Sequence, residues 1–172
     1  MKYLNKLHTN PLAWSALALS ALLLEIVALY FQYEMGLEPC IMCIYQRTAI
    51  WGIFIAGVLG TVANKITTIR ILSFTIWAIS SVWGLLIALE HIDMQSPTLS
   101  FLYSCDFTPN FPTWAPLHDL IPFLFEATGS CGDIKWDFLG YTMPETMVVV
   151  FGCYAFALSV ILVNLIALKI KT

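Results

Sequence analysis

The sequence predicts an all-α membrane protein built as a bundle of four transmembrane helices. Apolar residues make up 59% of its 172 positions and charged residues only 11%, against roughly 25% charged residues in an ordinary soluble domain. Four stretches are each long and apolar enough to cross a bilayer. A soluble domain of this size has too little interior to bury so much apolar surface. We therefore expect lipid to surround most of the chain.

The four predicted spans have the length that a hydrocarbon core requires, which is about 20 apolar residues. They cover approximately residues 12–33, 40–63, 69–90 and 145–168. Stretches of this length form helices rather than barrel strands, because a helix satisfies its own backbone hydrogen bonds in lipid. The apolar run of the first span is too long for a cleaved signal peptide and has no cleavage site after it. We expect it to remain as an anchor.

The positions of the cationic residues predict the orientation. Six of the eight lie before the first span, beside the link between the second and third, or after the fourth, namely Lys2, Lys6, Lys65, Arg70, Lys169 and Lys171. All six fall on one side of a four-span chain, which the positive-inside rule makes cytoplasmic. We expect one membrane domain over residues 1–172 with both termini in the cytoplasm. The outer loops then cover about residues 34–39 and 91–144.

The long outer loop contains a segment suited to the membrane interface. Residues 111–125 read FPTWAPLHDLIPFLF, in which aromatic and aliphatic residues mix with Pro, His and Asp. Trp and Phe anchor well at the level of the lipid headgroups. We expect this segment to contact the interface, and the alternative is a loop folded over the bundle.

A net charge of −3 gives no basic surface for nucleic acid, so nucleic-acid binding is excluded. The five cysteines are the residues that say most about chemistry. Cys40 and Cys43 form a C-x-x-C directly after Pro39, where the second span is expected to begin. The positive end of a helix dipole stabilises thiolates at such a position. Cys105 and Cys131 lie in the long outer loop. Cys153 lies within the fourth span, and we assign it no chemistry.

Three uses of the four outer cysteines remain open at this point. A structural zinc site normally takes its ligands from two tight pairs, whereas only Cys40 and Cys43 are close in sequence. A structural disulfide is a serious alternative for Cys105 and Cys131. Redox catalysis by thiol–disulfide exchange is the third use.

Polar residues near the C-x-x-C favour redox catalysis. Arg47 follows Cys43 by four residues, so the two share a helix face. An arginine inside a span costs about 2.5–3.5 kcal/mol on insertion scales and is a candidate functional residue, although it could also reach outward to the headgroups. His91 ends the third span at the same outer level, where it either lines an acceptor site or is an ordinary interfacial residue. We also raise the hypothesis that Glu25 of the first span pairs with Arg47.

A relay between two dithiols would need a strong electron acceptor. A thiol oxidant outside the cytoplasm can have a reduction potential of about −120 mV, so only a stronger electron acceptor can reoxidise it. A lipid-soluble quinone is such a two-electron acceptor within the bilayer. The sequence contains no metal or flavin motif, so we expect no metal and an organic cofactor for the last step.

The ordered motifs of the chain resemble those of the DsbB family, the bacterial inner-membrane disulfide bond formation proteins B. The resemblance extends over nearly the whole sequence. It is carried by PCIMCIYQR at 39–47, EH at 90–91, CDF at 105–107, FPTWAPL at 111–117 and WDFLGYTMP at 136–144.

The resemblance implies a protein-dithiol:quinone oxidoreductase whose active cysteines face the periplasm. A reduced DsbA-like thioredoxin-fold partner would attack a Cys105–Cys131 disulfide at Cys105. Cys131 would then attack Cys40, and Cys43 would pass electrons to ubiquinone, or to menaquinone under anaerobic conditions. In the family, the residues that match Arg47 and His91 lie by the quinone ring.

Other functions would make different use of the same cysteines. Quinone-epoxide reductases also combine a four-helix bundle with C-x-x-C, but their active pair lies on a different span. A non-enzymatic tetraspan scaffold with a stapled outer loop would leave Arg47 unexplained. A paralogue of the DsbB family that serves a dedicated thiol partner is a further alternative.

Overall fold

The computed structural model describes residues 8–96 and 108–171, and these form a bundle of four long helices. The helices are α2 (Pro11–Tyr33), α3 (Ile41–Ala63), α4 (Thr67–Gln95) and α7 (Met143–Lys171). Each contains a stretch long and apolar enough to cross a membrane, which confirms the predicted fold class. The orientation in the membrane stays a prediction.

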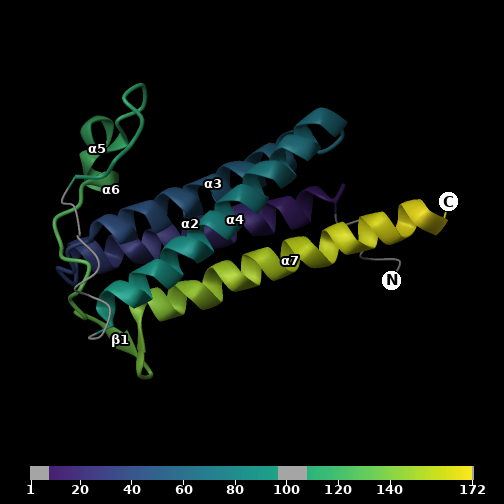
Figure 1. Cartoon of the computed structure of the whole chain (residues 1–172). Coiled ribbons are helices and arrows are strands. Elements are labelled where there is room, and N and C mark those ends of the chain that lie inside the picture. The colour runs from purple at the N-terminus through teal and green to yellow at the C-terminus, as the bar shows by residue number, and fades with distance from the viewer. Residues whose placement is uncertain (1–7, 97–107, 172) are drawn as a thin grey trace.

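The outer elements gather at one end of the bundle (Figure 1). They are α5 (Leu117–Leu120), α6 (Pro122–Phe125) and a hairpin of β1 (Asp137–Phe138) and β2 (Tyr141–Thr142). The beginning of α2 and the end of α7 lie toward the other end. The hairpin turns through Leu139 and Gly140, which both have positive φ, and leads directly into α7.

Local sequence explains where the first two long helices begin. At α2, the Asn10 side chain accepts a hydrogen bond from the Leu12 amide at 3.0 Å, and Pro11 occupies the first turn. At α3, the sulfur of Cys40 takes the capping role and accepts from the Cys43 amide at 3.3 Å. This confirms that Cys40 lies where the helix begins.

Helix α4, which contains the third predicted span, continues beyond the expected end of that span. The prediction ended the span at residue 90, but α4 continues to Gln95. The sequence has no helix-breaking residue here before Pro97, so nothing stops the helix at the membrane boundary. His91 therefore lies within α4, with its side chain fixed by helical backbone, rather than in the loop.

Helix α3 is the centre of the bundle. It packs against α2 on one side and α4 on the other, and α7 packs against α4. The core includes Trp14, Ile53, Trp77 and Phe151. Many large apolar side chains on the outer faces are exposed, as lipid contact requires; examples are Leu19, Leu23, Ile79, Leu86, Val149 and Phe156.

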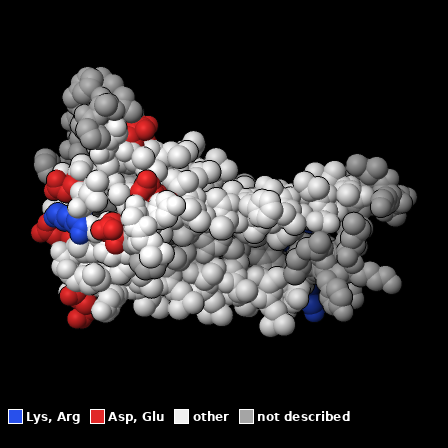
Figure 2. Space-filling view, turned by 90° about the horizontal axis from the view of Figure 1, so that it is seen from below, with Lys and Arg blue, Asp and Glu red and all other residues white. Residues whose placement is uncertain are grey.

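Charged residues are concentrated at the ends of the molecule. Figure 2 shows acidic and basic residues gathered at the end that carries the outer elements, with a basic group near the opposite end. The surface between them, along the helices, shows no charge in this view. Such an uncharged band matches the hydrocarbon core of a bilayer.

The segment predicted to lie at the interface has two different sides. Leu124 and Phe125 are buried and pack against Ile44 of α3. Trp114 is 84% exposed and Phe123 59% exposed. The inner side therefore folds over the bundle, while the outer side presents large apolar groups. Contact of that outer side with lipid stays a prediction.

Close packing of α2 on α3 depends on Gly57, and replacing it with alanine should destabilise the bundle. A Cβ atom at this position would lie 2.6 Å from the Ala18 backbone nitrogen. We expect a cost of about 1–3 kcal/mol, which is typical of overpacking. The thermal midpoint of helix unfolding in detergent measures it. Gly152→Ala is the matched control, because nothing lies within 4 Å of its added Cβ. Equal midpoints for the two variants would contradict this account of the packing.

Candidate redox site

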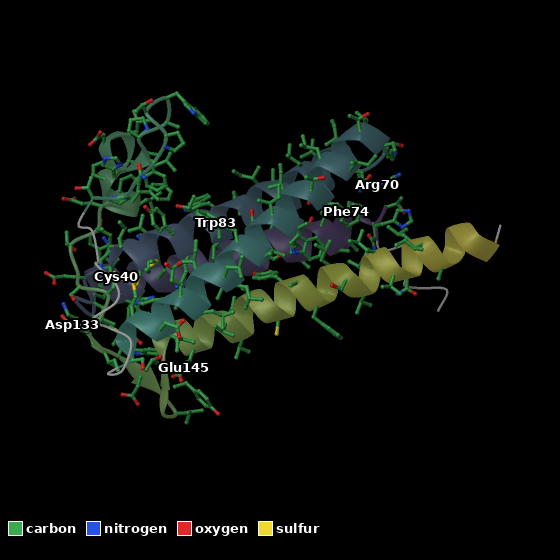
Figure 3. All side chains as sticks on the ribbon, in the orientation of Figure 1. Cys40, Arg70, Phe74, Trp83, Asp133 and Glu145 are labelled. Atoms are coloured by element: carbon green, nitrogen blue, oxygen red, sulfur yellow. The ribbon has the colours of Figure 1, made fainter. Side chains whose placement is uncertain are left out.

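The C-x-x-C forms a closely spaced dithiol at the first turn of α3. The sulfurs of Cys40 and Cys43 are 2.9 Å apart, and both residues are free cysteines. Cys40 is only 3% exposed. Figure 3 shows Cys40 at the end of the bundle that carries the outer elements. Asp133 of the long loop lies at the same end. The pair therefore lies where the membrane helices meet the outer loop.

The two sulfurs of the pair have different surroundings. The hydrogen bond with the Cys43 sulfur and, next, burial raise the pKa of the Cys40 thiol above its usual range. Cys43 lies on the side of α3 that also carries Arg47, one turn further along the helix. A nearby cation favours the thiolate form of a cysteine, so the surroundings of Cys43 suit a thiolate better than those of Cys40.

Cys43 and Arg47 line one cavity of about 400 Å³. Its wall comes from α2, α3, α7 and the loop before the hairpin, and most of it is apolar. The residues that line it include Leu24, Val27, Ala28, Phe31, Ile50, Trp136, Met147 and Val150. The polar side chains in the wall include Glu25, Gln32 and Gln46. An apolar cavity with a few converging polar groups is the usual form of a small-molecule site.

Arg47 is buried and held by three partners. Its Nε lies 3.0 Å from Oε1 of Glu25, and the two side chains are 6% and 4% exposed. Its Nη1 donates to Gln32 Oε1 at 2.8 Å and to the Leu124 carbonyl at 2.6 Å. The hypothesis of a Glu25–Arg47 pair is confirmed. The alternative in which Arg47 reaches outward to the headgroups is wrong, because its partners hold it inside the bundle.

His91 lies on the other side of the dithiol from Arg47. Its Nε2 is 3.5 Å from the Cys40 sulfur, and its Nδ1 is 3.3 Å from the Gln46 amide nitrogen. It does not belong to the wall of the 400 Å³ cavity. It lines a smaller pocket of about 60 Å³ together with Cys40 and Cys43. Contact of His91 with a quinone therefore stays a prediction.

The loop cysteine Cys131 is buried beside the dithiol. It is disulfide-bonded, 1% exposed, and packs in the same apolar cluster as Cys40 and Met94. Cys105 lies outside the described residues. The amides of Thr128 and Gly129 both donate to the Pro39 carbonyl at 3.0 Å. These bonds fix the chain before Cys131 against the chain before Cys40.

The same cluster offers ligands for a metal ion. The side-chain ligand atoms of Cys40, Cys43 and His91 all lie within 4.8 Å of one another. Two thiolates and an imidazole are ligands that zinc accepts. Within the described ranges, this is the group of side chains whose spacing could hold a metal ion.

Comparison with known proteins identifies the family. The family model for the disulfide bond formation protein DsbB matches residues 10–161. The chain belongs to the DsbB family. Disulfide bond formation protein B of Pseudoalteromonas translucida is 48% identical over 169 residues, which is 98% of each chain. The proteins of that name from Pseudoalteromonas atlantica and Psychromonas ingrahamii are 51% and 50% identical over 155 residues. The match to the Pseudoalteromonas atlantica protein covers 90% of both chains. The match to the Psychromonas ingrahamii protein covers 87% of this chain and 83% of the relative.

The structure also adds residues to this DsbB-family site that sequence reasoning missed. Gln32 and Gln46 bind Arg47 and His91, respectively. A signal for both existed, because polar side chains within spans normally face the bundle interior. Gln32 lies seven positions after Glu25, on the same face of α2. The Gly129–Pro39 contact had no comparable signal, since it joins a loop to a helix start.

Cys153 is exposed on α7 and lies away from the site.

Loss of the buried ion pair should cost far more stability than loss of an exposed one. Glu25→Ala leaves the Arg47 charge buried without its counterion, so we expect a loss of about 3–5 kcal/mol in the free energy of unfolding. Glu38→Ala removes the surface pair with Lys135, which spans 3.0 Å but is largely exposed, and should cost less than about 1 kcal/mol. Chemical unfolding in detergent compares the two. Similar losses would show that the buried pair is not a structural determinant.

Proposed function

We propose that this DsbB-family protein is a membrane protein-dithiol:quinone oxidoreductase. It reoxidises a DsbA-like thioredoxin-fold protein outside the cytoplasm and transfers the electrons to a quinone in the bilayer. One observation carries the proposal. The dithiol has one sulfur, Cys43, on the wall of an apolar cavity between membrane helices, and the other, Cys40, packed with the disulfide-bonded loop cysteine Cys131.

On the thiol side, the proposed route begins at the long loop. The reduced partner attacks a disulfide between Cys105 and Cys131 at Cys105, which releases Cys131 as a thiolate. Cys131 then attacks the sulfur of Cys40 in the oxidised pair and releases Cys43. Packing of Cys131 and Cys40 in one cluster supports this order, because exchange requires the sulfurs to approach closely. The bonds from Thr128 and Gly129 to Pro39 limit the search that this approach requires.

On the acceptor side, the cavity fits a quinone head group. Its volume of about 400 Å³ lies within the range of roughly 300–1,000 Å³ that small-molecule sites occupy. Its apolar wall opens between helices that face lipid. The bound quinone, ubiquinone or menaquinone, would accept two electrons and two protons. Cys43 would supply the electrons as its sulfur closes on Cys40, and Arg47 would orient the ring and stabilise the negative charge that develops on it.

The burial of Arg47 supports this role. A guanidinium already fixed by Glu25, Gln32 and the Leu124 carbonyl does not have to reorganise during the reaction. In an environment of low dielectric constant its charge also acts strongly on nearby groups. The positive charge of Arg47 therefore favours both a thiolate at Cys43 and a reduced oxygen in the cavity.

The proposed location is the bacterial inner membrane, with the active cysteines facing the periplasm. Lys65, between α3 and α4, and Arg70, in the first turn of α4, lie at the end of the bundle away from the outer elements (Figure 3), which supports this orientation through the positive-inside rule. The oxidising conditions of the periplasm also suit a protein that forms disulfides. A purely structural scaffold would not explain why this ion pair lines an apolar cavity next to Cys43.

Quinone reduction by the purified protein tests the proposal. With a reduced DsbA-like partner, the parent should turn over, whereas Cys40→Ser and Cys105→Ser should each lose turnover because the relay is interrupted. Arg47→Ala should raise the quinone KM by roughly tenfold or more, since it removes a charge-assisted contact worth about 1.5–3 kcal/mol. Cys153→Ser is the control and should behave as the parent. Turnover that survives loss of Cys40 would contradict the relay.

A further inference from the structure

Two hollow spaces meet at the dithiol and share part of their walls. One is the cavity of about 400 Å³ between the membrane helices, and the other is the outer pocket of about 60 Å³. Four residues line both of them, namely Leu37, Cys43, Trp136 and Met143. Each of the four therefore borders the cavity on one side and the outer pocket on the other. We call these four residues the partition.

The two spaces that the partition separates differ in polarity. The cavity has a mostly apolar wall, and its charged groups, Arg47 and Glu25, form an ion pair with each other. The wall of the outer pocket includes Ser130, Asp133 and Lys135. Figure 3 shows Asp133 at the outer end of the molecule. The outer pocket is therefore on the polar, outer side of the partition, and the cavity is on the side of the membrane helices.

Contacts with α2 hold two members of the partition together. The ring of Trp136 packs on the ring of Phe31 in the last turns of α2, with centroids 5.2 Å apart. The Leu37 amide donates to the carbonyl of the same Phe31 at 3.0 Å. The residues next to Trp136 and Leu37 in sequence, Lys135 and Glu38, form an ion pair at 3.0 Å. The chain before the hairpin and the link before α3 therefore lie side by side.

The other two members of the partition lie in the first turns of helices. Met143 is the first residue of α7, whose start is fixed because Oε2 of Glu145 accepts from the Thr142 amide at 2.7 Å and from its hydroxyl at 2.9 Å. Figure 3 shows Glu145 toward the same end of the molecule as Cys40. Cys43 lies in the first turn of α3. Four separate segments thus build the partition, and printed bonds or helical backbone hold each of them.

We propose that Trp136, as the largest side chain of the partition, keeps outer water and charged solutes out of the cavity. Cys40 lines only the outer pocket and Arg47 only the cavity, so Cys43 is the one sulfur of the dithiol that borders both spaces. Trp136 is a positioning residue, since it acts through the space that it fills. Exclusion of water strengthens the effect of the Arg47 charge on its neighbours.

The partition also bears on the proposed relay. If water-soluble thiols cannot enter the cavity, their electrons reach an acceptor there only through Cys43. This consequence rests on the proposed function. The partition itself does not, because the two walls and their shared residues are the same whatever acceptor the cavity takes.

The test measures whether a charged reagent from the outer solution reaches the cavity. Val150→Cys places a reporter thiol in the wall of the cavity but not in that of the outer pocket. The full chain is placed in bilayer nanodiscs with Cys153→Ser and with the Cys40–Cys43 pair oxidised, so that these cysteines do not compete. Iodoacetate and iodoacetamide are similar in size and differ in charge. Mass mapping gives the rate at which each alkylates the reporter, relative to its rate with the unfolded chain.

With Trp136 in place, iodoacetate should react roughly 10²-fold more slowly than iodoacetamide, because an anion must leave water to cross an apolar wall. Trp136→Ala should raise the iodoacetate rate by roughly tenfold or more, since the opening lets the anion pass with its water. The iodoacetamide rate should stay near that of the parent, because a neutral reagent can also enter from the lipid. Trp136→Phe should behave nearly as the parent, since an aromatic ring still fills the wall.

Two further variants complete the test. Trp114→Ala is the matched control, because Trp114 is 84% exposed and lines neither space. It should leave both rates unchanged. Leu37→Ala opens the partition from a different segment and should also raise the iodoacetate rate selectively. This variant keeps the inference testable if Trp136→Ala does not fold.

Several results would overturn the inference. Equal rates of the two reagents in the parent would show that no barrier exists. An unchanged iodoacetate rate in both Trp136→Ala and Leu37→Ala would show that these residues do not form it. A rise of both reagents together, or the same rise in Trp114→Ala, would indicate general loosening in place of a partition. The test contains no quinone and no thiol partner, so its failure is distinct from failure of the proposed function.

Discussion

A buried positive charge determines much of this structure. Arg47 lies inside a membrane bundle, where an unpaired guanidinium is too costly to keep, and it is retained by Glu25, Gln32 and the Leu124 carbonyl. Glu25 and Gln32 belong to α2, and Leu124 belongs to the outer loop. The charge of Arg47 therefore holds α2 and the outer loop against α3. Both members of this ion pair also lie in the wall of the apolar cavity that Cys43 lines. Stability and chemistry thus depend on the same ion pair.

The two sulfurs of the dithiol lie in different environments, which suits the two steps of the proposed relay. Cys43 lines an apolar cavity together with Arg47, and the proposed relay places the lipid-soluble acceptor there. Cys40 lies beside His91 and the buried loop cysteine Cys131, where the proposed relay places exchange with other thiols. Since the sulfurs are 2.9 Å apart, formation or opening of one S–S bond would link the two environments in the proposed relay.

Much of this arrangement was predictable from sequence because the bilayer imposes simple rules. The lengths of the apolar stretches predicted the four helices, and the position of Cys40 after Pro39 predicted the start of α3. The Glu25–Arg47 pair followed from similar depth and opposite charge. The position of His91 relative to the cavity did not follow, since α4 continues beyond the expected end and the ring direction depends on Gln46 and the Cys131 backbone. Tertiary contacts between a loop and a helix start leave no periodic pattern.

The most direct test of the central claim is the visible absorption of the protein when quinone binds. A thiolate against a quinone ring gives a charge-transfer band, and the assignment of Cys43 to the cavity wall predicts where that thiolate lies. The band should appear in the parent with a free Cys43 thiolate and in Cys40→Ser, and it should be absent in Cys43→Ser. A band that persists in Cys43→Ser would contradict the account, because the electrons would then leave from another residue.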